Sequence, residues 1–130
     1  MLNHVMIGVS DIEKSKAFYD AVLGELGAGE PMRHVNDTGQ TRLFYIANGD
    51  TFCLTEPIDG KAPTVANGST IGFKCADGDQ VKRIHDIALE HGGSTMEDPP
   101  GPRVGSMGTM NLSYFTDPDG HKLCGIHREA

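Results

Sequence analysis

The sequence has no tryptophan, only three cysteines and no long apolar run. Cys53, Cys75 and Cys124 are odd in number and widely spaced, so we expect free thiols in a reducing compartment rather than a disulfide framework. No apolar run approaches the roughly 20 residues that span a bilayer, and the N-terminal residues lack the basic and apolar segments of a signal peptide. The sequence therefore predicts a cytoplasmic protein with no membrane partner.

Basic residues are also scarce, with 11 Lys and Arg against 18 Asp and Glu, which gives a formal net charge of -7. Such an excess of negative charge repels phosphate backbones, so nucleic acid is not an expected partner. A chain of 130 residues is long enough for one domain with a core and short for two conventional ones. We expect a single domain over residues 1–130.

The sequence contains an internal repeat. A β-prone segment at 4–11 ends in Ser10-Asp11, and the segment at 70–77, which ends in Ala76-Asp77, repeats the β-prone pattern and the capping Asp 66 positions later. Each leads into a stretch with apolar residues at helical spacing, which ends at Gly27 in one half and at Gly92 in the other. Three shorter segments follow in each half. The repeat therefore predicts two modules of the order β-α-β-β-β.

Turn signals give the repeat its register. Asn48-Gly49 and Asp119-Gly120 separate the last two segments of each half and lie 71 residues apart, as do Phe44 and Phe115, and Cys53 and Cys124. These correspondences predict a first module at about 1–56, a linker at about 57–68 and a second module at about 69–130. We expect an α+β fold in which the two βαβββ modules form a curved mixed sheet around a cleft.

One stretch of the second module departs from the repeat. Residues 98–108 are rich in Pro and Gly, which predicts a mobile surface loop, placed where a flap over a site would lie.

Two segments carry a family resemblance. Residues 4–19, from His4 to the Phe18-Tyr19 pair, resemble the opening of proteins of the vicinal-oxygen-chelate superfamily, which includes glyoxalases, bleomycin-resistance proteins and extradiol dioxygenases. Residues 115–123, with the turn Asp117-Pro118-Asp119-Gly120, resemble the closing hairpin of the same superfamily. The resemblance spans nearly the whole chain and implies the glyoxalase/bleomycin resistance/dioxygenase fold.

The resemblance also implies where a metal site would lie. Metal ligands of the superfamily stand on the first and fourth strands of each module, and the matching positions here are His4, Cys53, Thr70 and Cys124. Glyoxalase-like members have His, Gln or Glu at these positions, and only His4 fits that pattern. Glu56 is a weak replacement, because strand alternation places it on the face opposite Cys53.

The sequence leaves three alternative interpretations of these four positions open. In the first, His4, Cys53 and Cys124 hold a divalent metal, for which zinc suits the His/Cys/Cys set best, with Thr70 or water as the fourth ligand. In the second, no metal is bound and the cleft only binds a small drug-like or metabolite molecule. In the third, His4 activates one cysteine as a nucleophile.

We therefore expect a protein that binds or transforms a small oxygenated molecule, with lyase, isomerase or dioxygenase-related chemistry if it is an enzyme. Metal-free small-molecule binding or resistance without catalysis is the alternative. A protein-interaction module, whose cleft is too shallow for any ligand, is the third class. Glyoxalase I activity is disfavoured, because a zinc-bound thiolate is a poor general base.

Several polar residues are candidates for substrate recognition within this cleft. They are Thr70, Arg42, Arg103, Tyr45 and Tyr114. The competing interpretation for the two tyrosines is an amphipathic strand. His85 and His91 are expected in solvent-facing or helix-capping roles. Exposed sheet edges predict a homodimer.

Overall fold

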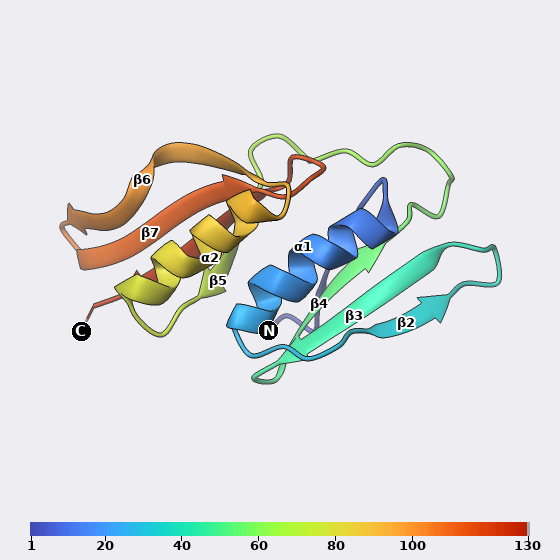
Figure 1. The fold of residues 1–130 in the computed structure, drawn as a ribbon, viewed down its shortest axis with the longest axis horizontal. Coiled ribbons are helices and arrows are strands. Elements are labelled where there is room, and N and C mark those ends of the chain that lie inside the picture. Colours follow the sequence, from blue (N-terminus) through green and yellow to red (C-terminus); the bar gives the residue numbers. More distant parts are fainter. Residues whose placement is uncertain (130) are drawn as a thin grey trace. The chain divides into compact units, whose positions relative to one another are not determined.

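The computed structural model describes residues 1–129 and divides the chain into two compact units, one from Met1 to Val65 and one from Ala66 on. Each unit consists of one helix and one four-stranded sheet, and the helix covers one face of its sheet (Figure 1). The order of elements is β-α-β-β-β in both units, which confirms the α+β class and the two predicted modules. The division falls inside the predicted linker. The cleft between modules and the single-domain organisation stay predictions.

The two sheets have the same topology, with strand order β1-β4-β3-β2 in unit 1 and β5-β8-β7-β6 in unit 2. The first and fourth strands of each unit are parallel neighbours and the other pairs are antiparallel. The elements of unit 1 are β1 (Val5–Gly8), α1 (Ile12–Glu25), β2 (Met32–Val35), β3 (Thr41–Ala47) and β4 (Asp50–Thr55). Those of unit 2 are β5 (Ile71–Lys74), α2 (Gly78–Glu90), β6 (Ser94–Gly105), β7 (Gly108–Thr116) and β8 (Lys122–Arg128).

The helices begin and end where the sequence predicts. Asp11 caps α1 by accepting a hydrogen bond from the Lys14 amide at 3.1 Å, and Asp77 caps α2 by accepting one from the Gln80 amide at 2.8 Å. Gly27 follows α1 with a φ of 102°, a left-handed conformation that glycine adopts without the strain a side chain would bring. None of the helices within residues 1–129 is long and apolar enough to span a membrane.

The core of unit 1 lies between α1 and one side of its sheet. The rings of Tyr19 on α1 and Phe52 on β4 have centroids 5.1 Å apart. The Tyr45 hydroxyl on β3 donates to an Asp20 carboxylate oxygen at 2.8 Å, and Tyr45 is only 2% exposed. This bond satisfies a polar group that burial would otherwise leave without a partner.

The core of unit 2 is built in the same way between α2 and its sheet. The Ser113 hydroxyl on β7 donates to the Val81 carbonyl of α2 at 2.9 Å. Phe115 packs edge-on against His85, with ring centroids 6.3 Å apart. Gly125 on β8 lets the helix approach closely, because a Cβ at this position would lie 2.7 Å from Cδ1 of Ile84.

The prediction of a mobile loop at 98–108 is wrong for most of its length, because residues 98–105 belong to β6 and residues 101–105 pair with β7. Proline is tolerated here because β6 is an edge strand and its pairing with β7 is interrupted between Met96 and Gly101. The Arg103 guanidinium donates to the carbonyls of Asp98, Pro99 and Gly101 at 3.2, 3.0 and 3.1 Å. These bonds satisfy carbonyl groups at the irregularity and fix its shape.

The repeat register is also one residue off in the third strands. Phe44 pairs with Cys53, whereas Phe115 pairs with Leu123, and it is Tyr114 that pairs with Cys124. The reason is turn length: β3 and β4 are joined by residues 48–49 alone, whereas β7 and β8 are joined by residues 117–121. A shift of one residue moves a side chain to the other face of the sheet, so Phe44 and Phe115 are not equivalent.

Candidate functional site

Most of the candidate site residues, but not Tyr45, belong to the sides of the sheets that face away from the helices. We call this side the open face of each unit. Alternation along the strands and the pairing register assign its members. The open face of unit 1 includes His4, Met6, Met32, Arg42, Phe44, Ile46, Cys53 and Thr55, and that of unit 2 includes Thr70, Gly72, Met96, Arg103, Tyr114, Lys122 and Cys124.

The four positions implied by the family resemblance form two matching pairs. Met6 of β1 pairs with Cys53 of β4, and Gly72 of β5 pairs with Cys124 of β8. His4 stands two residues before Met6, as Thr70 stands two residues before Gly72, so each lies on the face of the neighbouring cysteine. The register thus places Met6 with Cys53 on one face of unit 1 and Gly72 with Cys124 on one face of unit 2, whereas His4 and Thr70 precede the strands, and their convergence with the cysteines stays a prediction.

In unit 1 the thiol is buried and the imidazole is exposed. Cys53 has no exposed surface, and burial raises the pKa of its thiol, although the positive charge of Arg42 acts in the opposite direction. The Arg42 Nε donates to the Thr55 hydroxyl at 3.3 Å. Among residues 1–129 this is the one polar contact of the Arg42 side chain, so its two terminal nitrogens are available to a ligand. His4 lies in an exposed position with Nδ1 at 2.7 Å from the Asn3 amide oxygen.

In unit 2 the thiol belongs to a polar cluster. Burial raises the pKa of the Cys124 thiol and the Glu97 carboxylate adds to the rise, whereas a hydrogen bond with Tyr114 and the positive charges of Lys122 and Arg103 lower it. The Lys122 ammonium lies 4.8 Å from the centre of the Tyr114 ring and forms an ion pair with Glu97. Both cations of this cluster are therefore already engaged, Lys122 by Glu97 and Arg103 by backbone carbonyls.

One candidate recognition residue, Tyr45, does not lie on the open face where the sequence analysis expects substrate recognition. Tyr45 lies on the helix-facing side of its sheet, where its contacts with α1 fit the amphipathic-strand interpretation. Tyr114, by contrast, is on the open face beside Cys124. Thr70 is exposed and precedes β5.

The expectation of a solvent-facing or helix-capping role is wrong for His85 and fits His91, which follows the last residue of α2. His85 is not solvent-facing, because it is only 6% exposed, with Nε2 at 2.8 Å from the Thr95 hydroxyl and Nδ1 at 3.0 Å from the Asp86 carboxylate. The sequence pattern did not predict its burial, because histidine is a polar residue and was not counted among the apolar positions of the helix. His91 is exposed with Nδ1 at 2.8 Å from the Ile87 carbonyl, a helix-capping contact as expected.

The donor set of the open faces does not fit a hard divalent ion such as manganese or magnesium. Such ions prefer carboxylate, carbonyl and water oxygens, whereas the strand-four positions hold Cys53 and Cys124. Within residues 1–129 no group of three His, Cys, Asp or Glu side chains is placed to hold a metal ion.

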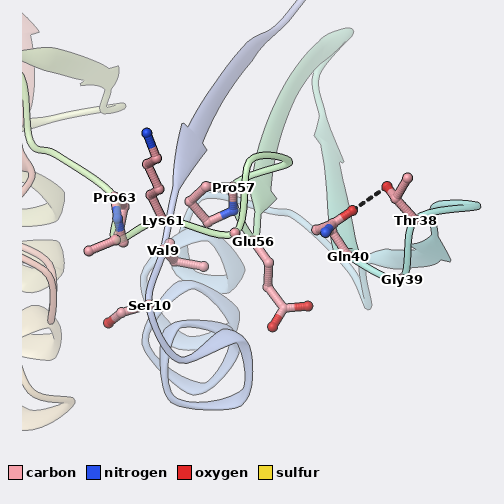
Figure 2. A pocket seen from close by; sticks show the side chains of 11 residues that line it. Val9, Ser10, Thr38, Gly39, Gln40, Glu56, Pro57, Lys61 and Pro63 are labelled. Carbon is pink, nitrogen blue, oxygen red and sulfur yellow. Dashed lines mark hydrogen bonds between the residues drawn. The ribbon is translucent and has the colours of Figure 1, made fainter.

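A pocket that sequence reasoning missed lies in unit 1. It has a volume of about 370 Å³ and opens where β1 and β4 end, so that Glu56 lines it rather than the open face (Figure 2). Its other walls are the turn between β2 and β3 and part of the segment after β4. The available signal was the run of turn-forming residues, with Gly39 and Gly60, near the ends of the strands. The lining residues are Val9, Ser10, Thr38, Gly39, Gln40, Glu56, Pro57, Gly60, Lys61, Ala62 and Pro63.

Comparisons with known proteins give relatives over the whole length of the chain. A metallothiol transferase FosB of Lysinibacillus sphaericus (strain C3-41) is 27% identical over 123 residues, which are 94% of this chain and 78% of the relative. A crystal structure of a glyoxalase/bleomycin resistance protein from Albidiferax ferrireducens T118 has a TM-score of 0.87 at 45% identity and covers 98% of this chain and 99% of that one.

A more distant likeness shows the fold alone. FosX, a fosfomycin resistance protein from Listeria monocytogenes complexed with Mn(II) and sulfate ion, has a TM-score of 0.72 at 19% identity, covering 99% of this chain and 93% of that one. The model of the Glyoxalase/Bleomycin resistance protein/Dioxygenase superfamily matches residues 1–124. With two βαβββ units and a family match over nearly all its residues, the chain belongs to this superfamily.

Proposed function

We propose that this chain binds a small oxygenated organic anion at the open faces of its sheets, without a metal ion held by protein carboxylates. The observation that carries the proposal is the state of the two equivalent thiols, Cys53 and Cys124. Both are buried, and burial raises the pKa of each, so they line their faces as neutral groups. A metal-free binding or resistance protein is the function that this chemistry supports.

Arg42 is the residue that supplies the charge complementarity. Its guanidinium lies on the open face of unit 1, half-buried, with one nitrogen bonded to Thr55. The two terminal nitrogens can donate in parallel to a carboxylate, phosphate or phosphonate group, a geometry that lysine cannot provide. Tyr114, with its hydroxyl beside Cys124, is the matching neutral donor on the open face of unit 2.

The relatives support a ligand of this class. One FosX structure from Listeria monocytogenes contains 1S,2S-dihydroxypropylphosphonic acid together with Mn(II), at 18% identity to this chain. The ligand type, a small hydroxylated molecule with an oxyanion, suits Arg42. The manganese does not suit the thiols, so we infer that charge recognition by the guanidinium replaces recognition by metal.

A second candidate is a zinc site with lyase or isomerase chemistry. The observation in its favour is that His4 lies on the same face as Cys53 in unit 1, and that Cys124 occupies the equivalent position in unit 2. Imidazole and thiolate are ligands that zinc accepts, and Thr70 or water would complete the set. This candidate requires zinc to displace protons from two thiols whose pKa is raised.

Calorimetric titration separates the two candidates. We expect methylphosphonate to bind the wild-type chain equally well with and without EDTA, and Arg42→Gln to weaken binding at least about tenfold, since a hydrogen bond between charged groups is worth about 1.5–3 kcal/mol. Arg33→Gln is the matched control, because Arg33 lies on the helix-facing side of the same sheet and pairs with Glu13 at 2.8 Å. Binding that EDTA abolishes, or that Arg42→Gln leaves unchanged, would refute the proposal.

We further propose that the protein acts as a cytoplasmic homodimer. Met32 and Ile46 on the open face of unit 1 are each 62% exposed, which is a large apolar surface for a free chain. Light scattering coupled to size-exclusion chromatography should give a mass of two chains over a range of micromolar concentrations. A mass of one chain at every concentration would refute the dimer.

A further inference from the structure

The pocket of unit 1 holds a carboxylate that no cation neutralises. Glu56 follows β4 directly, and one of its carboxylate oxygens, Oε1, accepts a hydrogen bond from the Thr41 amide at 2.7 Å. Among residues 1–129 the carboxylate forms no ion pair, and Oε2 accepts no hydrogen bond. The Lys61 side chain, which also lines the pocket, extends away from it (Figure 2). A fixed, half-buried acceptor therefore faces the pocket.

The walls beside this carboxylate are rigid and largely apolar. Pro57 and Pro63 have a fixed φ and line the side formed by the segment after β4. Pro63 packs against β1 so closely that a Cβ at Gly8 would lie 3.1 Å from its Cβ. Val9 adds a branched side chain next to them. The cavity of about 370 Å³ is thus already formed in the free chain and is within the range of small-molecule sites.

The opposite wall is polar and equally well fixed. Thr38 and Gln40 are joined by a hydrogen bond between their side chains (Figure 2). The turn that carries them is closed by a hydrogen bond that the Asn36 amide donates to the Gln40 carbonyl at 2.8 Å. Gly39 between them has a φ of 94°, which glycine adopts at little cost.

We propose that this pocket is a second binding site, for a small molecule that carries a protonated amine on a short aliphatic stem. The ammonium group donates to Oε2 of Glu56, and the stem packs against Pro57, Pro63 and Val9. The net charge of -7 favours a cationic ligand over an anionic one at this position. The site is independent of the proposed anion site, because neither Arg42 nor Cys53 lines the pocket.

Nuclear magnetic resonance of the ¹⁵N-labelled full chain tests this site, with n-butylamine hydrochloride as the probe and n-butanol as its uncharged counterpart. The Thr41 amide reports directly, because it donates to Glu56, and Gly39 and Gly60 report from the two walls. We expect saturable shifts of these amides with butylamine and none with butanol. Shifts that grow linearly without saturation, or equal shifts with butanol, would overturn the proposal.

Two variants make the test specific for the carboxylate. Glu56→Gln keeps an oxygen that accepts from the Thr41 amide but removes the charge, and should weaken butylamine binding at least about tenfold. Asp37→Asn removes one negative charge from the neighbouring turn, where Asp37 is exposed and does not line the pocket. It should leave the affinity unchanged. An equal loss in both variants would show a general charge effect, and no loss in Glu56→Gln would likewise overturn the site.

Discussion

At the scale of single residues, the thiols dominate the chemistry of this chain. All three cysteines are free and buried, and the pKa of Cys75 rises to about 11, mainly because burial penalises the thiolate. Cys75 forms a hydrogen bond from its sulfur to the Phe73 carbonyl at 3.6 Å. Neutral, buried thiols of this kind are poor nucleophiles, which argues against His4 activating a cysteine.

The raised thiol pKa values predict how stability depends on pH. Above pH 9 the unfolded chain releases thiol protons that the folded chain keeps, so the free energy of unfolding should fall as the pH rises toward 11, by at most about 1.4 kcal/mol per pH unit for each such thiol. Urea titrations between pH 8 and pH 10.5 measure this slope. Cys75→Ala should make the slope shallower, and an unchanged slope in this variant would contradict the shifted pKa.

At the scale of elements, one glycine sets the distance between α2 and its sheet. A methyl group on Gly125 would lie 2.7 Å from Cδ1 of Ile84 and 2.9 Å from the Ser113 hydroxyl, which is itself bonded to the helix. We therefore expect Gly125→Ala to destabilise the chain by about 1–3 kcal/mol in chemical denaturation, as overpacked cores do. Ile84→Val should partly restore stability.

The matched control for this substitution is Gly72→Ala on β5. A Cβ there would meet only Cγ2 of Ile126, at an ordinary contact distance of 3.9 Å. Its effect on the free energy of unfolding should stay within about 0.5 kcal/mol. Equal losses for both substitutions would show that close helix approach is not the cause.

Arg103 should hold the irregular part of β6 in place. Arg103→Lys keeps the charge but loses the planar fork that reaches three carbonyls, so amide hydrogen exchange in residues 101–105 should become faster. Arg128→Lys, at the exposed end of β8, is the control and should leave the exchange unchanged. Exchange in 101–105 that is already as fast as in an unstructured peptide in the wild type would contradict the strand.

The elements also show what the sequence could and could not predict. Helix caps and module order follow from local signals, namely Asp11 and Asp77 before the helices and glycine after them. The faces of Tyr114 and Phe115 do not, because Asn48-Gly49 and Asp119-Gly120 look alike although one turn has two residues and the other five. Strand pairing at 101–105, next to Pro99 and Pro100, does not follow either, because no sequence pattern indicates that Arg103 bonds to the carbonyls before it.

At the scale of the candidate site, the positions could be predicted but not their roles. The family resemblance pointed to His4, Cys53, Thr70 and Cys124, and the register gives the two cysteines equivalent neighbours. Their assignment as metal ligands stays a prediction. The Glu56 pocket was not foreseen, because it depends on how the segment after β4 folds back on Gly8.

At the scale of the whole molecule, the chain has the superfamily fold and carries one buried thiol on the fourth strand of each unit. The family model matches residues 1–124, so the duplication and the topology are retained. Function therefore has to be argued from the side chains, since the same fold supports many activities.

The most direct test of the central claim, that the open-face thiols are not metal ligands, is native mass spectrometry of the full chain. The chain is incubated with zinc sulfate or manganese chloride and then transferred to a volatile buffer without chelator. We predict the mass of the metal-free chain in both cases. One zinc ion per chain that is retained by Cys75→Ser but lost in Cys53→Ser and in Cys124→Ser would contradict this account.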